Sequence, residues 1–246
     1  MNTLPQMKTI DTLVAELSSE IRVYEASEGY SASILHLSRK SHINILQVTA
    51  SQSEALFAVR HEVFRPTNKF SLRNYLPDHL DPPEDVIQFY NKICFAWLWW
   101  KTGWVLEMPG WAGNCTGFDY IRGLQGPSYL LRFCELTTDC YYALRTNDNG
   151  VNWDVIFTTG VETDEIYARE ATSVFPNFTA WLDYMHANDG WPPWPGYPED
   201  CSWGGYYRYV DRRLPDSEVI TRYGSIEALL PRLKIKVFKH LGECRP

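Results

Sequence analysis

The stretch from residue 129 to residue 189 constrains the fold more tightly than any other, because its apolar residues change period partway along. Apolar side chains dominate 129–145, and Trp153, Val155 and Phe157 then recur at every second position, as in a β-strand. The segment between the two runs ends in Asn-Gly, a pair that accepts the positive φ of a tight hairpin turn. The pattern therefore predicts an antiparallel pair of strands.

From residue 174 to residue 185 the apolar residues take the period of an α-helix. They fall at i, i+4, i+7, i+8 and i+11, on one helical face: Val174, Phe178, Trp181, Leu182 and Met185. Ser173 is predicted to cap this helix, and the run Asn-Asp-Gly at 188–190 to end it. We expect the aromatic face to pack against the sheet, with Trp181 in the core.

The rest of the chain supplies further elements by the same signals. Helices are predicted over residues 9–28, 51–65, 82–101 and 225–233, from apolar periods and capping residues. Strands are predicted over 33–37, 43–49, 104–108 and 206–210, and a last strand or helical turn over 235–238. Length alone allows two modest domains, but no linker divides the chain. We expect one globular domain, 1–246, of α+β class, with a mostly antiparallel sheet packed against several helices.

Charge and hydropathy exclude some classes of function. The net charge is −7 and the pI is near 5.4, and no Lys/Arg cluster interleaves with aromatic residues, so nucleic-acid binding is disfavoured. The first residues lack a basic region followed by an apolar run, and no stretch is long enough to span a bilayer. We expect a protein of the cytoplasm that does not enter membranes.

The six cysteines are scattered, with no CxxC pair and no Cys/His grouping at the spacing of zinc ligands. Cys94 and Cys134 fall in apolar runs, which favours free, buried thiols. No metal and no cofactor is predicted from these patterns.

Motifs of known enzymes are missing as well. The sequence contains no GxSxG elbow, no GxxxxGK[ST] loop, no HExxH and no GxGxxG after a strand. The candidates that remain are a thiol, Cys134 or Cys140, beside His186, and a carboxylate pair, Glu135 and Asp139. Structural roles explain these residues at least as well, so no catalytic residue is assigned. An enzyme with a dispersed Cys/His or carboxylate site stays open as the alternative.

Several short motifs appear in an order that resembles the SUKH superfamily. They are Leu76-Pro77 with Pro82-Pro83, Phe89-Tyr90-Asn91 in a helix, Glu107-Met108-Pro109 ending a strand, the hairpin, and Phe175-x-x-Phe178-x-x-Trp181-Leu182. The resemblance covers about 72–190 and makes 1–71 and 191–246 N- and C-terminal extensions. The chain departs from the family where bulky residues, 96–100, replace a glycine after the first helix, and in the long glycine-rich stretch 110–126.

The resemblance implies non-enzymatic protein binding. Members of this superfamily include toxin-immunity proteins that neutralise basic, nuclease-type toxins, and a regulator of cell-wall synthesis. We therefore expect a protein-interaction module, an immunity-type protein or a regulatory adaptor, that binds a basic protein; its oligomeric state stays open. The predicted partner-binding residues are an acidic run and a proline-stiffened aromatic loop: Glu162, Asp164, Glu165, Trp191, Trp194 and Tyr197.

Overall fold

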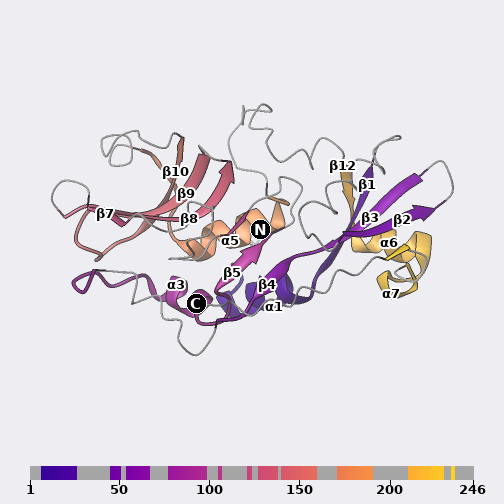
Figure 1. Cartoon of the computed structure of the whole chain (residues 1–246), viewed down its shortest axis with the longest axis horizontal. Coiled ribbons are helices and arrows are strands. Elements are labelled where there is room, and N and C mark those ends of the chain that lie inside the picture. The colour runs from indigo at the N-terminus through magenta and orange to yellow at the C-terminus, as the bar shows by residue number, and fades with distance from the viewer. Residues whose placement is uncertain are drawn as a thin grey trace, which may run out of the picture.

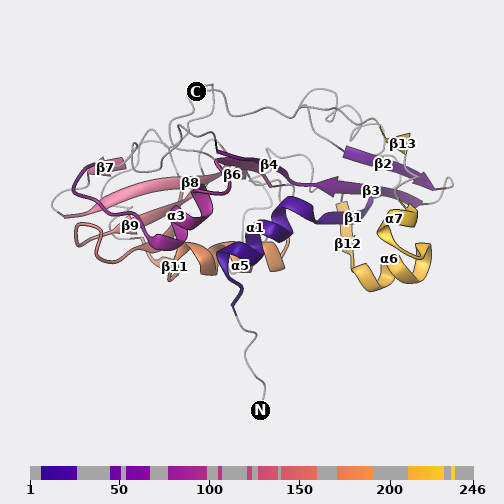
Figure 2. The same cartoon turned by 90° about the horizontal axis from the view of Figure 1, so that it is seen from below.

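The computed structural model describes residues 7–26, 45–50, 54–66, 77–98, 105–106, 121–123, 127–137, 140–159, 171–190, 210–229 and 234–235. Within these ranges the chain has the expected α+β class. The described strands form two sheets whose pairings are all antiparallel. The two sheets lie side by side (Figure 1), and the helices gather on one side of them (Figure 2).

The smaller sheet combines strands from the two ends of the chain. Its order is β12 (Val210–Leu214), β1 (Ile21–Ala26), β3 (Glu54–Arg60), β2 (Ile45–Ala50) and β13 (Lys234–Ile235). Two short helices, α6 (Asp216–Tyr223) and α7 (Ile226–Leu229), follow β12. Val219 and Leu229 of these helices form a small apolar cluster with Val23 and Leu214 of the sheet. The cluster covers one face of β1.

The larger sheet contains the predicted hairpin. Its order is β11 (Ser173–Phe175), β10 (Asp154–Thr159), β9 (Cys140–Thr146), β8 (Tyr129–Thr137), β6 (Val105–Leu106), β5 (Phe95–Trp97) and β4 (Glu62–Phe64), and β7 (Ile121–Gly123) also pairs with β8. A single residue, His61, separates β3 from β4. The chain therefore passes directly from one sheet to the other at His61.

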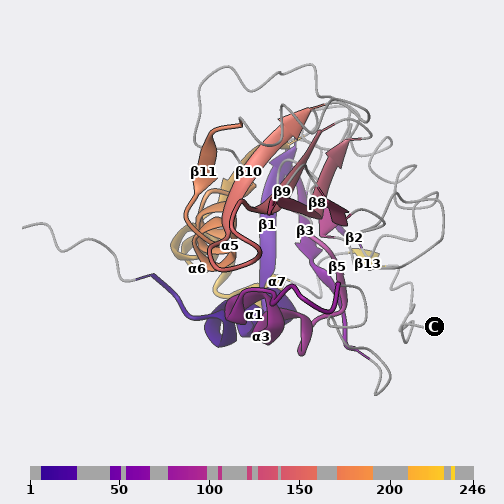
Figure 3. The ribbon, with the colours of Figure 1, turned by 90° about the vertical axis from the view of Figure 1, so that its left-hand side faces the viewer.

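Three helices pack against the larger sheet around Trp181. They are α1 (Ile10–Ser19), α3 (Glu84–Tyr90) and α5 (Phe178–Ala187), and α1 and α3 lie side by side (Figure 3). The side chain of Trp181 is fully buried, with its ring centroid 4.7 Å from that of Phe133 and 5.5 Å from that of Tyr142. The expected placement of Trp181 in the core is confirmed. Apolar residues of α1 and β4 join the same core, which thus extends outside 72–190.

The hairpin prediction is confirmed at its turn and corrected in its first strand. Strands β9 and β10 pair directly, and Asn149 and Gly150 between them have φ of 58° and 89°. The run 129–145, however, is two strands, β8 and β9, that pair with each other. Apolar composition does not show where a strand reverses, because both strands of a buried pair are apolar.

The helix that follows begins later than predicted. Residues 173–175 pair with β10 as β11, and the N-cap is Asn177, whose Oδ1 accepts a hydrogen bond of 2.8 Å from the backbone of Ala180. The predicted stop is confirmed, since Asp189 and Gly190 have φ of 55° and 81°.

Three predicted helices are wrong in whole or in part. Residues 54–64 form β3 and β4, the helix from residue 9 ends at Ser19 before β1, and the helix from residue 82 ends at Tyr90 before β5. In each case, antiparallel neighbours pair with the segment and give it a strand geometry. Helix α6 was not predicted. Short elements overlap the predicted 43–49, 104–108, 225–233 and 235–238, although β2 continues to Ala50 and β13 shares only Ile235 with its prediction. The predicted 206–210 is described only at Val210, and 33–37 lies outside the described residues.

The two cysteines with described side chains differ. Cys134 on β8 is a buried thiol that forms no disulfide, as expected. Cys94 is disulfide-bonded, which corrects the expectation of free thiols, and its partner is not among the described side chains. Because disulfides are rare in the cytosol, Cys94 gives no support to the expected cytoplasmic location. None of the helices in the described ranges is long and apolar enough to cross a bilayer.

Candidate functional site

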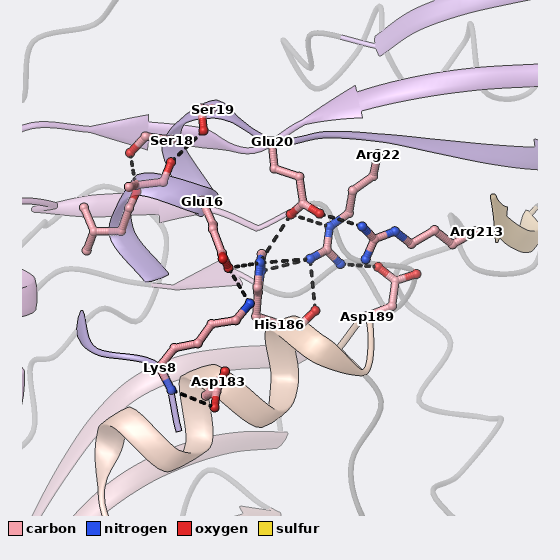
Figure 4. A network of polar contacts seen from close by, with 12 residues as sticks. Lys8, Glu16, Ser18, Ser19, Glu20, Arg22, Asp183, His186, Asp189 and Arg213 are labelled. Atoms are coloured by element: carbon pink, nitrogen blue, oxygen red, sulfur yellow. Dashed lines mark hydrogen bonds and ion pairs between the residues drawn. The ribbon is translucent and has the colours of Figure 1, made fainter. Parts of the chain in front are cut away.

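A cluster of ionisable side chains with a buried centre lies beside His61, where the chain crosses from one sheet to the other. We call it the seam cluster; its members are Lys8, Glu16, Glu20, Arg22, Tyr24, His61, Asp183, His186, Asp189 and Arg213 (Figure 4 shows most of them). They come from the smaller sheet, from His61 at the crossing between β3 and β4, and from α1 and α5 with their flanking residues. The cluster therefore joins parts of the chain that are far apart in sequence.

Arg22 is the centre of the seam cluster because its guanidinium reaches three partners. Its Nε donates to Glu20 Oε2 at 2.9 Å, and its Nη1 to Asp189 Oδ1 at 2.7 Å. Its Nη2 donates to the backbone oxygen of His186 at 3.0 Å. The side chain is only 1% exposed. Burial lowers the pKa of Arg22, but Tyr24, Glu20 and Asp189 more than offset that effect and raise it, so the group stays charged.

Strand alternation explains why Arg22 and Tyr24 act together. Residues i and i+2 of a strand point to the same face, so these two side chains share one face of β1 while Val23 points to the apolar cluster on the other. Tyr24 Oη donates to Asp189 Oδ1 at 2.6 Å. Burial raises the pKa of Tyr24 well above its ordinary value, and the Asp189 carboxylate raises it further, so the phenol keeps its proton.

Asp189 is placed by the way in which α5 ends. The backbone N–H of Gly190 donates to the carbonyl of Met185 at 2.8 Å. This hydrogen bond, from the sixth residue back to the first, defines a Schellman motif. That motif requires a left-handed residue at position 189, where glycine is usual and aspartate costs some strain. The two hydrogen bonds that the Asp189 carboxylate accepts from Arg22 and Tyr24 offset this cost.

His186, on the last turn of α5, contacts Arg22 through the face of its ring. Arg22 Nη2 lies 2.9 Å from Nδ1 and 3.5 Å from Nε2 of His186. An atom in the ring plane along the lone pair of one nitrogen would be much farther from the other nitrogen. The guanidinium nitrogen therefore lies above the ring. On the carboxylate side, His186 Nε2 is 3.1 Å from Glu16 Oε2 and 3.4 Å from Glu20 Oε2.

Both histidines of the seam cluster are held in the neutral form. Burial, and then the charge of Arg22, lower the pKa of His186 from 6.5 to about 3, although Glu16 acts in the opposite direction. Burial and Arg22 also lower the pKa of His61 well below its ordinary value. The two rings lie 6.4 Å apart between centroids. Each imidazole therefore keeps a nitrogen lone pair at neutral pH.

The outer members of the seam cluster balance its charge. Lys8 Nζ is 2.7 Å from Glu16 Oε2, and Arg213 Nη2 is 2.5 Å from Glu20 Oε1. The described members carry three cations, Lys8, Arg22 and Arg213, and four carboxylates, Glu16, Glu20, Asp183 and Asp189. With neutral histidines, the seam cluster has one net negative charge. The side chains of Lys8 and Glu16 are 39% and 34% exposed, so solvent screens this outer pair more than the pairs of Arg22.

The seam cluster is closed to solvent at its centre. His61 is 5% exposed and His186 is 4% exposed, beside the fully buried Arg22. Catalysis on a substrate requires contact between the substrate and the reacting side chains, and these side chains are covered. Glu20, His61 and His186 each offer one atom that could bind a metal ion. These three atoms all lie within 4.8 Å of one another.

The structure describes only some of the site residues that the sequence predicted. Glu162, Asp164, Glu165, Trp191, Trp194 and Tyr197 lie outside the described residues, as does Asp139. Cys134 and His186 are both buried, and the side chains of Cys140 and Glu135 are not described. Sequence reasoning missed the seam cluster because Arg22 and His186 are 164 positions apart. The available signal was the alternation of Arg22 and Tyr24, which the predicted continuation of the first helix to residue 28 concealed.

Acid should weaken the folded protein through His186. Between pH 6.5 and about 3 the unfolded chain binds a proton at this imidazole and the folded protein does not, so the free energy of unfolding falls as the pH falls. The expected loss is about 2 kcal/mol between pH 7 and pH 5. His61 adds to the loss in the same direction. Urea denaturation at the two pH values, with a chelator present, measures it.

Two variants separate this effect from the other titrating groups. His186→Gln cannot titrate and should flatten the dependence of stability on pH. His79→Gln should keep the dependence, because His79 is exposed and bonds to Tyr129, away from the seam cluster. An equal dependence in His186→Gln and the unchanged protein would contradict the assignment.

Comparison with other proteins identified no relative of this chain. Searches against family models, curated proteins and solved structures each found no match. The class of the protein therefore rests on its own architecture, an α+β fold of two antiparallel sheets in which ion pairs connect the smaller sheet to the ends of α1 and α5.

Proposed function

We propose that this chain is a non-enzymatic protein-interaction module, either an immunity-type protein that neutralises a basic toxin or a regulatory adaptor. One observation carries the proposal: the ionisable side chains of the seam cluster are paired with one another, and those at its centre are buried. Such a cluster holds structural elements together rather than presenting groups to a substrate. A rigid frame of this kind suits recognition, because binding then costs little ordering of the protein.

Charge supports a basic partner. The chain carries a net charge of −7, which produces a negative field around the molecule. Complementary charge mainly speeds the encounter of two proteins, and buried aromatic side chains supply most of the lasting affinity. The acidic run and the aromatic loop expected from the sequence match these two roles.

The position of these segments in the chain is consistent with such a surface. Residues 162–165 belong to the connection between β10 and β11, which form one end of the larger sheet. Residues 191–197 follow Gly190, which closes α5. Both segments thus leave from elements that the buried core holds in place, and connections on a rigid scaffold commonly carry binding residues.

Two sets of substitutions should alter binding in different ways. Reversal of Glu162, Asp164 and Glu165 to Lys should slow association about tenfold or more at low salt and weaken its salt dependence. Trp191→Ala or Trp194→Ala should leave association nearly unchanged and speed dissociation about tenfold or more, because truncation of an interface hot spot costs roughly 2 kcal/mol. Surface-plasmon kinetics at two salt concentrations resolves both rates.

A pull-down with two matched baits identifies the partner for this measurement. The unchanged chain and the triple charge-reversal variant serve as parallel baits in an extract of the native source, and mass spectrometry quantifies each captured protein. The partner is a basic protein enriched on the first bait alone. Reversal of Asp216, an exposed residue of α6, is the control for a general effect of charge. Absence of any such protein, with both baits folded, would contradict the proposal.

A further inference from the structure

Three side chains of the types that bind metal ions converge within the seam cluster. Glu20 follows the end of α1, His61 stands between β3 and β4, and His186 lies in the last turn of α5. One ligand atom from each lies within 4.8 Å of the other two. No local spacing brings these residues together, so their convergence is a result of the tertiary structure.

We propose that Glu20, His61 and His186 bind one divalent transition-metal ion, for which zinc is the best fit. Two imidazole nitrogens and one carboxylate oxygen are a known ligand set for zinc, and imidazole also suits the neighbouring first-row metals. Because zinc binds such sites more tightly than most of these metals, it is the appropriate first probe. The proposal is independent of the protein-binding function above.

The distances at His186 fit this role. Two ligands of one tetrahedral zinc ion, each about 2 Å from the metal, stand roughly 3.3 Å apart. His186 Nε2 and Glu20 Oε2 are 3.4 Å apart. Arg22 Nη2 lies above the imidazole ring and not in its plane, so Arg22 does not block the direction from which a metal approaches a ring nitrogen.

Protonation and charge also permit a cation here. Metal ions bind the neutral imidazole, and the buried position of both histidines favours that form. The positive charge of Arg22 opposes a second cation, whereas the carboxylates of Glu16 and Glu20 beside His186 Nε2 attract one. Glu16, with Oε2 3.1 Å from His186 Nε2, supplies an oxygen for a fourth ligand. A divalent ion changes the described charge of the seam cluster from −1 to +1.

The buried position assigns the ion a structural role. The three ligands come from different elements, so one ion would connect α1, the crossing from β3 to β4, and α5. An ion that binds the folded state alone raises Tm as its free concentration rises. Zinc should therefore increase Tm, and a chelator should reverse the increase.

The experiment titrates the full chain, stripped with a chelator and desalted, with zinc chloride in a calorimeter. We expect saturation at one ion per chain. Cobalt chloride in place of zinc should give the weak visible bands of a site with nitrogen and oxygen ligands. No saturable binding would overturn the proposal, and so would a strong thiolate-to-cobalt charge-transfer band, which would assign the metal to cysteine. Because both measurements use the unchanged chain, they do not depend on how well a variant folds.

Variants then locate the ion. His61→Gln and His186→Gln should each weaken zinc binding by at least about 100-fold, since even the loss of an outer partner of a ligand costs up to that factor. His79 is exposed and lies outside the seam cluster. The variant His79→Gln should therefore bind zinc as the unchanged chain does. Circular dichroism establishes that each variant is folded. Unchanged affinity in both His61→Gln and His186→Gln would overturn the site.

Discussion

Trp181→Ala should lower the free energy of unfolding by about 3–5 kcal/mol, the usual cost of replacing a buried tryptophan by alanine. The indole is fully buried between α5 and the larger sheet, and its ring contacts Phe133, Tyr142 and Phe178. Alanine leaves a cavity that these aromatic rings cannot fill by small movements, because interiors are close-packed. For a chain of this length Tm should fall by roughly 6–20 °C.

Calorimetry and urea denaturation measure this effect, and Ile220→Ala is the matched control. Ile220 also lies on a helix, α6, but is 56% exposed, so its truncation should change the free energy of unfolding by no more than about 0.5 kcal/mol. If Trp181→Ala melts within a degree or two of the unchanged protein, the packing described for α5 is incorrect.

Arg22→Met should cost about 3 kcal/mol or more, although methionine fills much of the same volume. The reason is electrostatic: Asp189 loses the guanidinium that neutralises it, and removal of one partner of a buried ion pair is strongly destabilising. Glu20 keeps its pair with Arg213. The backbone oxygen of His186 also loses a hydrogen bond. Urea denaturation at neutral pH, with a chelator present, gives the value.

A second arginine on the same protein provides the control. Arg222 pairs with Glu25 and Glu218 on the surface, where solvent screens the charges, so Arg222→Met should change stability little. Addition of Asp189→Asn to Arg22→Met should recover part of the loss, because the amide has no charge to leave unpaired. Additive losses from the two substitutions would contradict the pairing described here.

Local chemistry in the sequence was sufficient for the hairpin and for the aromatic helix face. The turn before β10 follows from Asn149-Gly150, since few other pairs accept positive φ at both positions. The placement of Trp181 follows from spacing, because residues four and seven apart on a helix share one face. Together with the antiparallel hairpin, these signals are enough for the α+β class. Each of them operates over a dozen residues or fewer.

Where an apolar run fits two periods, the sequence did not decide between them. Leu56, Val59 and Val63 suit one face of a helix, but 54–60 pairs with β1 on one side and β2 on the other. Likewise, Ile21 continues the apolar stripe of α1 and yet begins β1. Pairing with a strand distant in sequence satisfies the backbone hydrogen bonds of these segments, and tertiary contacts of this kind override weak local propensity.

The amino-acid sequence by itself determined the turn at Asn149-Gly150, the helix stop at Asp189 and the aromatic residues that α5 packs against the sheet, because each depends on backbone conformation or on spacing within one element. Only the tertiary structure decided that the Asp189 carboxylate, which the sequence marks as part of a helix end, pairs with Arg22 and Tyr24. The physical reason is that an ion pair depends on distance in space. Charges 167 positions apart along the chain meet only when two sheets and a helix have packed together.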